Sequence, residues 1–266
     1  MISTTHSLLG RRLLIFGVLS ISVIASAEQR LIPIGDRRVS INCDGKTGHS
    51  ATVVLMAGGG RTAKDWNDVQ PTVAGFTRVC SYDRAGLGDS EKTLQMQSVG
   101  EIVEDLHAVL QAAREASPYV LVAHSIAGIY ARDFETRFPH ETLGMVLLDS
   151  SHEEQAMRLQ ELLNPSIPAP VKMVELQGFF SQPGKRLQWQ TDVPLVVLAH
   201  GKTSPSPGLT DLQSEAWERI WRELQQDLAM RSPHGQFRIA DKSGHFIHVD
   251  QPDLVIQAIR DVSQPH

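Results

Sequence analysis

The chain has 266 residues, of which 41% are hydrophobic and 21% are charged. This length and apolar content fit one domain with a sizeable core, and they exclude a chain dominated by disordered, low-complexity sequence. The formal net charge is −5, so nucleic acid is not an expected partner, because proteins that bind it carry basic surfaces.

The first 27 residues have the pattern of a secretory signal peptide. Arg11 and Arg12 precede an apolar run over residues 13–24, and residues 25–27 (Ala-Ser-Ala) provide a small-residue cleavage site. The apolar run is shorter than the roughly 20 residues that span a bilayer, so we expect cleavage after Ala27 and no stable membrane anchor. Cleavage removes two arginines and no acidic residue, which changes the formal charge from −5 to −7. We therefore expect an exported protein, periplasmic or extracellular, and both the general secretory route and the twin-arginine route stay open.

Strand-like and helix-like segments alternate after this signal. Residues 30–44 are typical of a hairpin of two strands with a turn near Gly35. Unbroken apolar runs that favour buried parallel strands lie at residues 52–56, 119–124, 144–149 and 194–199. Helical spacing is found over residues 99–113 and 214–230. The alternation predicts an α/β fold with a mostly parallel sheet that helices cover on both faces.

Residues 28–266 contain no internal repeat or interdomain linker, so we expect one domain. Residues from about 150 to 192 have helical fragments that prolines interrupt, which is typical of a small lid inserted between strands. Apolar lid residues would suit an apolar substrate unless they only pack the lid down; they are Met173, Leu176, Phe179 and Phe180.

Ser125 lies at a predicted turn from a strand (residues 119–124) into a helix (126–138). Such a turn strains the serine backbone and requires small residues two positions before and after it, which here are Ala123 and Ala127. The run VLVAHSIAGIYAR resembles the nucleophile elbow of the α/β-hydrolase superfamily, with alanine at both flanks where glycine is usual. The resemblance implies the α/β-hydrolase fold and Ser125 as the nucleophile.

The segment SGHFIHVDQP resembles the superfamily's loop after the last strand, which carries the base histidine. The resemblance implies His245 as the base, and Gly244 permits the sharp turn that exposes it. His248 is the nearby competitor, and we interpret it as a helix-entry or surface histidine. His124, next to the nucleophile, points to the opposite face of an extended strand, so we interpret it as a packing or supporting histidine.

Two carboxylates are candidates for the acid that orients this histidine. Most of the superfamily place the acid just after the strand that ends here at Ala199, but residues 200–204 contain no carboxylate, and Asp211 is the first acid downstream. Some branches place it at the end of the preceding strand, where this chain has Asp149. We favour Asp149 and keep Asp211 as the alternative.

The loop MAGGGRTAKDW resembles the superfamily's oxyanion loop, with Ala57 in place of a histidine. The resemblance implies the N–H groups of Gly59 and Ile126 as donors to the oxyanion. A glycine-rich turn after a strand can also bind phosphate, but this one lacks the Gly-Lys-Ser/Thr ending of a P-loop. The run DRAGLG, which includes Arg84, resembles the turn after the fourth strand, whose usual role is to shape the pocket wall.

The resemblance also makes the strands that carry Cys43 and Cys80 neighbours in the sheet. Because an exported protein folds in an oxidising compartment, we expect a disulfide between them, and the alternative is two buried free thiols. The histidines lack the spacing of metal ligands, so we expect no metal, and nothing in the sequence implies a cofactor.

The expected function is hydrolysis of a small, fairly apolar carboxylic ester by an exported serine hydrolase. Two alternatives stay open. One is an aminopeptidase or amidase of the proline-iminopeptidase type, in which Glu153 or Glu154 clamps a free amine, although residues 150–154 also match a helix capping box. The other is a catalytically silent ligand-binding descendant of the fold. A small molecule is the expected partner in each case, and no oligomeric state is predicted.

Overall fold

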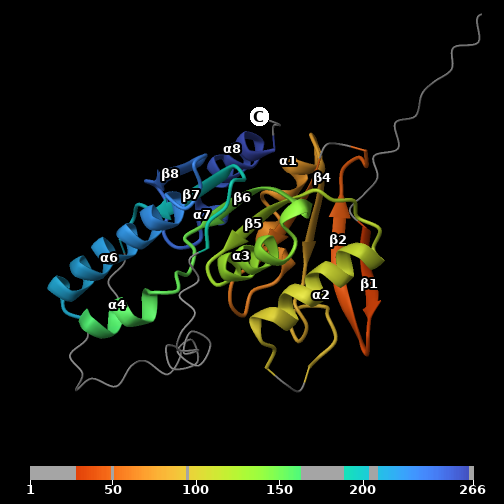
Figure 1. The fold of residues 1–266 in the computed structure, drawn as a ribbon, viewed down its shortest axis with the longest axis horizontal. Helices are drawn as coiled ribbons and strands as arrows, with labels where there is room; N and C mark the ends of the chain where they lie inside the picture. The colour runs from red at the N-terminus through yellow and green to blue at the C-terminus, as the bar shows by residue number, and fades with distance from the viewer. Residues whose placement is uncertain (1–27, 49–50, 94–95, 163–188, 204–208, 264–266) are drawn as a thin grey trace, which may run out of the picture.

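The predicted strands form one eight-stranded sheet with the order β1-β2-β4-β3-β5-β6-β7-β8. A computed structural model describes residues 28–48, 51–93, 96–162, 189–203 and 209–263 (Figure 1). The strands are β1 (Glu28–Ile34), β2 (Arg37–Asp44), β3 (Thr52–Met56), β4 (Arg78–Tyr82), β5 (Tyr119–His124), β6 (Thr142–Leu148), β7 (Leu195–His200) and β8 (Gly235–Ala240). β1 and β2 pair antiparallel, as do β2 and β4, and the other neighbours are parallel.

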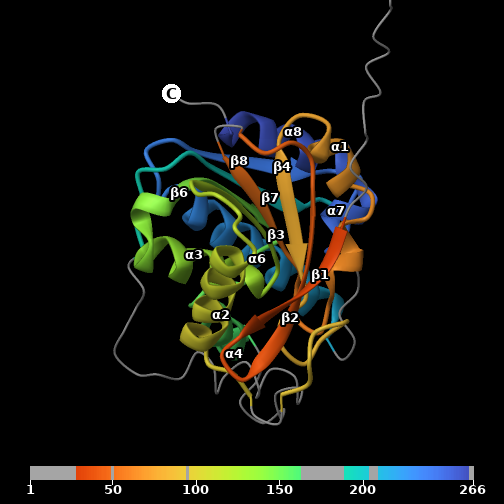
Figure 2. The ribbon, with the colours of Figure 1, turned by 90° about the vertical axis from the view of Figure 1, so that its right-hand side faces the viewer.

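Helices cover both faces of the sheet (Figure 2). They are η1 (Ala63–Trp66), α1 (Gln70–Ala74), α2 (Val99–Ala112), α3 (Ala127–Arg137), η2 (Pro139–Glu141), α4 (Gln155–Leu162), α6 (Asp211–Ala229), α7 (Ile247–Asp250) and α8 (Pro252–Val262). Buried residues of α2, α3 and the end of α6 pack on one face, and those of η1, α1, α7 and α8 pack on the other. The predicted α/β-hydrolase architecture is therefore confirmed.

The alternation of side chains along the parallel strands builds both cores. In β3, Val54 and Met56 belong to the cluster under α2 and α3, whereas Val53 and Leu55 belong to the cluster under α1 and α8. Successive side chains of a strand point to opposite faces, so a strand covered on both faces has to be apolar at every position. This requirement explains the unbroken apolar runs of the sequence.

Helix α6 begins three residues earlier than the sequence predicted. Thr210 Oγ1 accepts a hydrogen bond from the N–H of Gln213, and Gln213 Oε1 accepts one from the N–H of Thr210. This reciprocal capping satisfies two backbone donors at the start of the helix and makes Asp211 its first residue.

The strands that carry the two cysteines are neighbours, with Cys43 opposite Cys80 in the register of β2 and β4. The two sulfur atoms are bonded at 2.08 Å, and both residues are buried. In the described part of the chain the one group of three potential metal ligands consists of these cysteines and Glu115. Its sulfurs are bonded to each other, and its carboxylate pairs with Arg30 and Arg78.

Several predictions from the sequence concern residues outside the described ranges. The signal peptide over residues 1–27 lies there, and so does most of the proposed lid, including its four apolar residues. Of the lid, the structure describes the entrance and α4, and Figure 1 shows α4 beside α6. In the described ranges no helix is both long and apolar enough to cross a bilayer.

Candidate active site

Ser125 lies on a left-handed turn between β5 and α3. Its φ angle is +56°, a conformation that non-glycine residues rarely adopt. Three backbone hydrogen bonds hold this turn. The Ser125 N–H donates to Leu148 O at 3.0 Å, and the Ser125 carbonyl accepts from the N–H groups of Gly128 at 3.1 Å and Ser151 at 3.0 Å. The flanking Ala123 and Ala127 are fully buried, as the elbow requires. Strain of this kind persists only where its surroundings maintain it, and here β6 and the lid entrance do so.

His245 contacts Asp149 beside this serine. The distance between His245 Nδ1 and Asp149 Oδ2 is 2.6 Å, and all three residues line one cavity of about 310 Å³. A carboxylate only accepts hydrogen bonds, so Nδ1 carries the proton and Nε2 is left as the acceptor. Within the described residues no hydrogen bond joins the Ser125 hydroxyl to His245. In serine hydrolases without substrate this distance is often too long for a hydrogen bond, and it shortens when substrate binds.

Asp149 is almost fully buried, with 1% of its surface exposed. Besides His245, it accepts hydrogen bonds from Trp221 Nε1 at 2.7 Å and from His200, whose Nδ1 lies 2.8 Å from Oδ1 and 2.9 Å from Oδ2. Burial alone would raise the pKa of Asp149, but the hydrogen bonds from His200 and His245 outweigh burial and hold this pKa well below its usual value. Asp149 is therefore a carboxylate at neutral pH.

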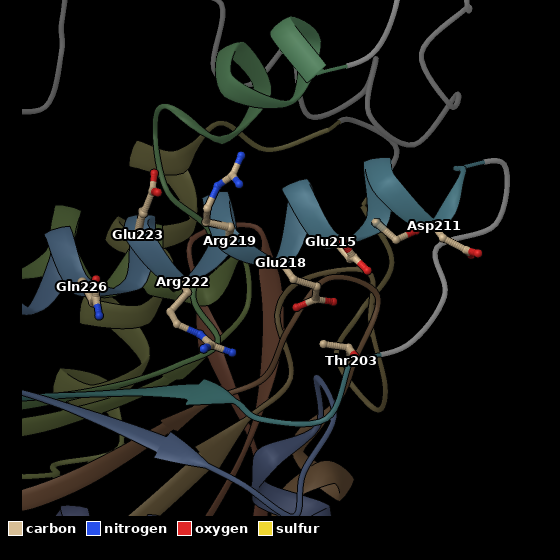
Figure 3. A pocket seen from close by; sticks show the side chains of 9 residues that line it. Thr203, Asp211, Glu215, Glu218, Arg219, Arg222, Glu223 and Gln226 are labelled. Carbon is tan, nitrogen blue, oxygen red and sulfur yellow. The ribbon is translucent and has the colours of Figure 1, made fainter.

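Asp211, the other candidate acid, lies elsewhere. As the first residue of α6 it lines a different cavity of about 620 Å³, together with Thr203, Glu215 and Arg222 (Figure 3). Among the described residues, no hydrogen bond or ion pair joins its side chain to His245. Of the two carboxylates, the structure brings Asp149 to the histidine.

The glycine-rich loop after β3 packs directly against the elbow. A Cβ atom at Gly58 would lie 2.8 Å from His124 Nδ1 and 3.3 Å from Ser125 Cβ, so only glycine fits there without a shift. A Cβ at Gly59 would lie 3.6 Å from Ile126 Cγ2. Among the described residues the N–H groups of Gly59 and Ile126 donate to no acceptor. Beside Ser125 there are therefore two backbone donors that an anion could use.

Arg84 holds this glycine-rich loop through two hydrogen bonds. Its Nη1 donates to the carbonyl of Ala57, and its Nη2 donates to the carbonyl of Gly58 at 2.5 Å. The C=O and N–H of a trans peptide point in opposite directions, so holding the Gly58 carbonyl fixes the direction of the Gly59 N–H. From the sequence, this turn is predicted only to shape the pocket wall. The burial of Arg84, which the structure shows, indicates the further role.

Two other histidines lie behind His245: His124 contacts His245 directly, and His248 contacts His124, with 4.6 Å between their ring centroids. His124 Nε2 lies 2.9 Å from the carbonyl oxygen of His245, and the two ring centroids are 4.6 Å apart. His248 belongs to α7, as the helix-entry interpretation predicted, but it is fully buried because the Trp66 ring covers it at 4.7 Å. The prediction of a surface position was wrong. Burial lowers the pKa of His124 and lowers that of His248 to about 4, so both are neutral near pH 7.

Three residues of the site were not found from the sequence: His200, Glu218 and Trp221. His200 ends β7, where most of the superfamily carry the acid, and its Nε2 lies 2.8 Å from Glu218 Oε2. Residues 200–204 contain no carboxylate, and the histidine at this strand end is the sequence signal that indicates a polar group there. Strand ends at this edge of a parallel sheet converge on one site.

Comparison with known proteins gives the same fold class as the structure. The chain belongs to the alpha/beta hydrolase family, whose model matches residues 53–258. It is 26% identical over 223 residues to the uncharacterized protein YqjL of Bacillus subtilis, and the matched region covers 82% of this chain and 85% of YqjL. It is 24% identical over 239 residues to pyrrolizixenacetamide deacetylase of Xenorhabdus hominickii, covering 86% and 80% of the two chains.

Solved structures agree on the fold. The structure of carboxylesterase CesB from Bacillus subtilis matches with a TM-score of 0.63 at 14% identity, covering 89% of this chain and 91% of that one. At this identity the likeness concerns the fold alone. Together with the family membership it supports a hydrolase.

Proposed function

We propose that this chain is an exported serine hydrolase that cleaves a small, fairly apolar carboxylic ester through an acyl-enzyme on Ser125. The observation that carries the proposal is the 2.6 Å contact between His245 Nδ1 and Asp149 Oδ2 in the cavity that Ser125 lines. A serine hydroxyl is a poor nucleophile at neutral pH. An imidazole that a buried carboxylate orients is the group that activates it.

In the first half of the reaction, Ser125 Oγ attacks the carbonyl carbon of the ester and its proton passes to His245 Nε2. Asp149, held ionised by its hydrogen bonds, stabilises the imidazolium that forms. The bond between the carbonyl carbon and the alkoxy oxygen then breaks, and the alcohol leaves with the proton from His245. Water attacks the acyl-enzyme by the same route and releases the acid.

The tetrahedral intermediate in each half carries a negative oxygen. In this proposal the N–H groups of Gly59 and Ile126 donate to that oxygen, since neither N–H has an acceptor among the described residues. Loss of one such donor typically costs about 3 kcal/mol of transition-state stabilisation. Arg84 acts indirectly, by holding the carbonyl of the peptide that carries the Gly59 donor.

Two tryptophans of α6 support an apolar substrate. Trp217 and Trp221 line the cavity with Ser125, and their ring centroids lie 5.5 Å apart. Aromatic walls favour an acyl or aryl group over a charged one. Lys202 and Gln155 line the same cavity and offer polar contacts to the rest of the substrate.

Amide hydrolysis is the second candidate, and the relative named pyrrolizixenacetamide deacetylase favours it. The aminopeptidase form of this candidate has less support. The carboxylate of Glu153 pairs with Arg132 at 3.3 Å and also with Arg231, so its charge is already balanced. An amine clamp at Glu153 would have to break these pairs.

The proposal is tested by comparing matched substrates on the mature chain. We expect 4-nitrophenyl butyrate to be hydrolysed faster than the anilide of the same acid, and we expect Ser125→Ala to abolish both reactions. Faster turnover of the anilide would favour the second candidate. No turnover of either substrate by a folded sample would favour a ligand-binding protein instead.

Export is the part of the proposal that concerns residues 1–27. Expression of the full chain in a bacterial host, followed by intact mass measurement of the periplasmic fraction, should show a protein that begins at Glu28. A cytoplasmic product that retains residues 1–27 would contradict export.

A further inference from the structure

We propose that His200 and Glu218 are positioning residues for the reaction: a charged His200, held by Glu218, fixes the carboxylate of Asp149 that contacts His245. This inference rests on the proposed function, because it assumes that Asp149 orients His245. It concerns a pair of residues that a Ser-His-Asp mechanism does not itself require.

The contacts of His200 indicate that both of its ring nitrogens carry a proton. Its Nδ1 lies 2.8 Å from Asp149 Oδ1, and its Nε2 lies 2.8 Å from Glu218 Oε2. Two carboxylates only accept hydrogen bonds, and only the imidazolium form of histidine donates from both nitrogens. Because its Nε2 is engaged by Glu218, His200 cannot replace His245 as the base for Ser125.

Electrostatics favours the same protonation state. Burial lowers the pKa of His200, but the hydrogen bonds and charges of Asp149 and Glu218 outweigh burial and raise this pKa to about 9. The titratable groups that line the cavity together with His200, among the described residues, are Asp149 after β6, Glu218 from α6, Lys202 after β7 and His245 after β8. Of these, Asp149 and Glu218 contact the ring nitrogens.

Helix α6 holds Asp149 by two routes. Trp221 donates directly to Asp149 Oδ1, and Glu218, three residues earlier on the same helix face, holds His200 against both carboxylate oxygens. Figure 3 shows the Glu218 side chain directed from α6 toward the loop that carries Thr203, which follows His200 closely. Glu218 also lines both the catalytic cavity and the larger neighbouring one. The pair therefore links the position of Asp149 to the docking of α6.

The arrangement has a pH dependence of defined sign. While His200 is charged it donates to both carboxylates. As the pH rises through about 9 the ring loses one proton and one of its two hydrogen bonds, and the two carboxylates are no longer separated by a cation. Hydrolysis should therefore decline at alkaline pH with the titration of His200.

The experiment measures the rate at which a fluorophosphonate modifies Ser125 between pH 6 and pH 10.5, because this rate reads the activated serine without a hydrolysable ester. In the wild type we expect a decline with a midpoint near 9. Glu218→Gln keeps an oxygen that accepts from Nε2 but removes the charge, so the midpoint should fall by roughly one unit. Asp211→Asn removes a charge from the same helix outside this network, and it should leave the midpoint unchanged.

Two substitutions of His200 separate positioning from simple packing. Asparagine places an N–H donor where Nδ1 lies, so His200→Asn should keep the rate at pH 7 within about fivefold of wild type and remove the alkaline decline. His200→Ala loses the donor, and its rate should fall about a hundredfold at every pH. Titration of the His200 ring in the Ser125→Ala protein, followed by ¹⁵N NMR, gives its protonation directly and should show the midpoint near 9.

The outcomes are distinguishable. If the wild type is labelled, and the alkaline midpoint of the labelling rate is the same in the wild type, His200→Asn and Glu218→Gln, this inference alone is overturned. A ring of His200 that titrates near 6.5 in the NMR measurement overturns it as well. A folded wild type that is labelled at no pH overturns the proposed function, and this inference with it.

Discussion

At the scale of single residues, Asp149 makes the contacts that define the candidate site. It accepts from His245, His200 and Trp221, and its φ angle of +44° places it in the left-handed region that non-glycine residues rarely adopt. Because Asp149 is ionised and almost fully buried, the loss of its hydration has to be offset by several hydrogen-bond donors. The histidines and the tryptophan provide them. The strained backbone of Asp149 likewise persists only where the surroundings hold it.

Asp149→Asn should lower kcat by about 10³- to 10⁴-fold, because an amide that donates toward Nδ1 stabilises the wrong tautomer of His245. Asp211→Asn is the matched control and should retain kcat within about twofold, since Asp211 lies in the other cavity. Steady-state kinetics on an activated ester gives both values. A large loss in Asp211→Asn with activity kept in Asp149→Asn would reverse the assignment of the acid.

At the scale of an element, the loop between β3 and η1 depends on a residue from another loop. Arg84 follows β4 and donates to the carbonyls of Ala57 and Gly58. We expect Arg84→Met to lower kcat by about 10- to 100-fold with a smaller change in KM, because the Gly59 N–H loses its fixed direction while the cavity keeps its aromatic walls. Arg84→Lys should recover part of the loss. A raised KM with unchanged kcat would point to a role in substrate binding instead.

The pair β2 and β4 carries the one covalent crosslink among the described residues. Cys43 and Cys80 are 37 positions apart, and closing a loop of this length in the unfolded chain is worth about 4 kcal/mol in the chain-entropy model. The double variant Cys43→Ser, Cys80→Ser should therefore lower the midpoint of guanidinium unfolding. Reductant should have the same effect on the wild type and none on the double variant. Equal midpoints for both proteins without reductant would show that the bond does not stabilise the chain.

Local patterns predicted the elements better than the contacts between them. Unbroken apolar runs identified β3, β5, β6 and β7, because a strand buried on both faces requires them. The nucleophile elbow is also a local pattern, because Ser125 and its small neighbours lie within the five residues 123–127. The contacts of Asp149 with His200 and Trp221 span 51 and 72 residues, so no local pattern contains them. The contact of Arg84 with the glycine-rich loop after β3 and the burial of His248 under Trp66 likewise join residues that are distant in the sequence.

At the scale of the whole molecule, the charge network behind the site ties stability to pH. The pKa of His200 is raised from its usual 6.5 to about 9 in the folded chain, so its contribution to stability is fully present below about 6.5 and is lost as pH rises through 9. The pKa of Asp149 is depressed, so its contribution is present above the usual carboxyl range and is lost in strong acid.

We therefore expect the free energy of unfolding to decrease between pH 7 and pH 10. His200→Asn should decrease less over this range, because asparagine does not titrate. Urea titrations of both proteins at three pH values measure the difference. The same pH dependence in the two proteins would show that His200 makes no net contribution.

The most direct measurement of the central proposal is to identify the residue that a fluorophosphonate modifies, by mass spectrometry of peptides from the mature chain. We predict one modification, on Ser125, that is absent in His245→Ala and in a denatured sample. Modification of another serine, or equal labelling of Ser125 in His245→Ala, would contradict a nucleophile that His245 activates.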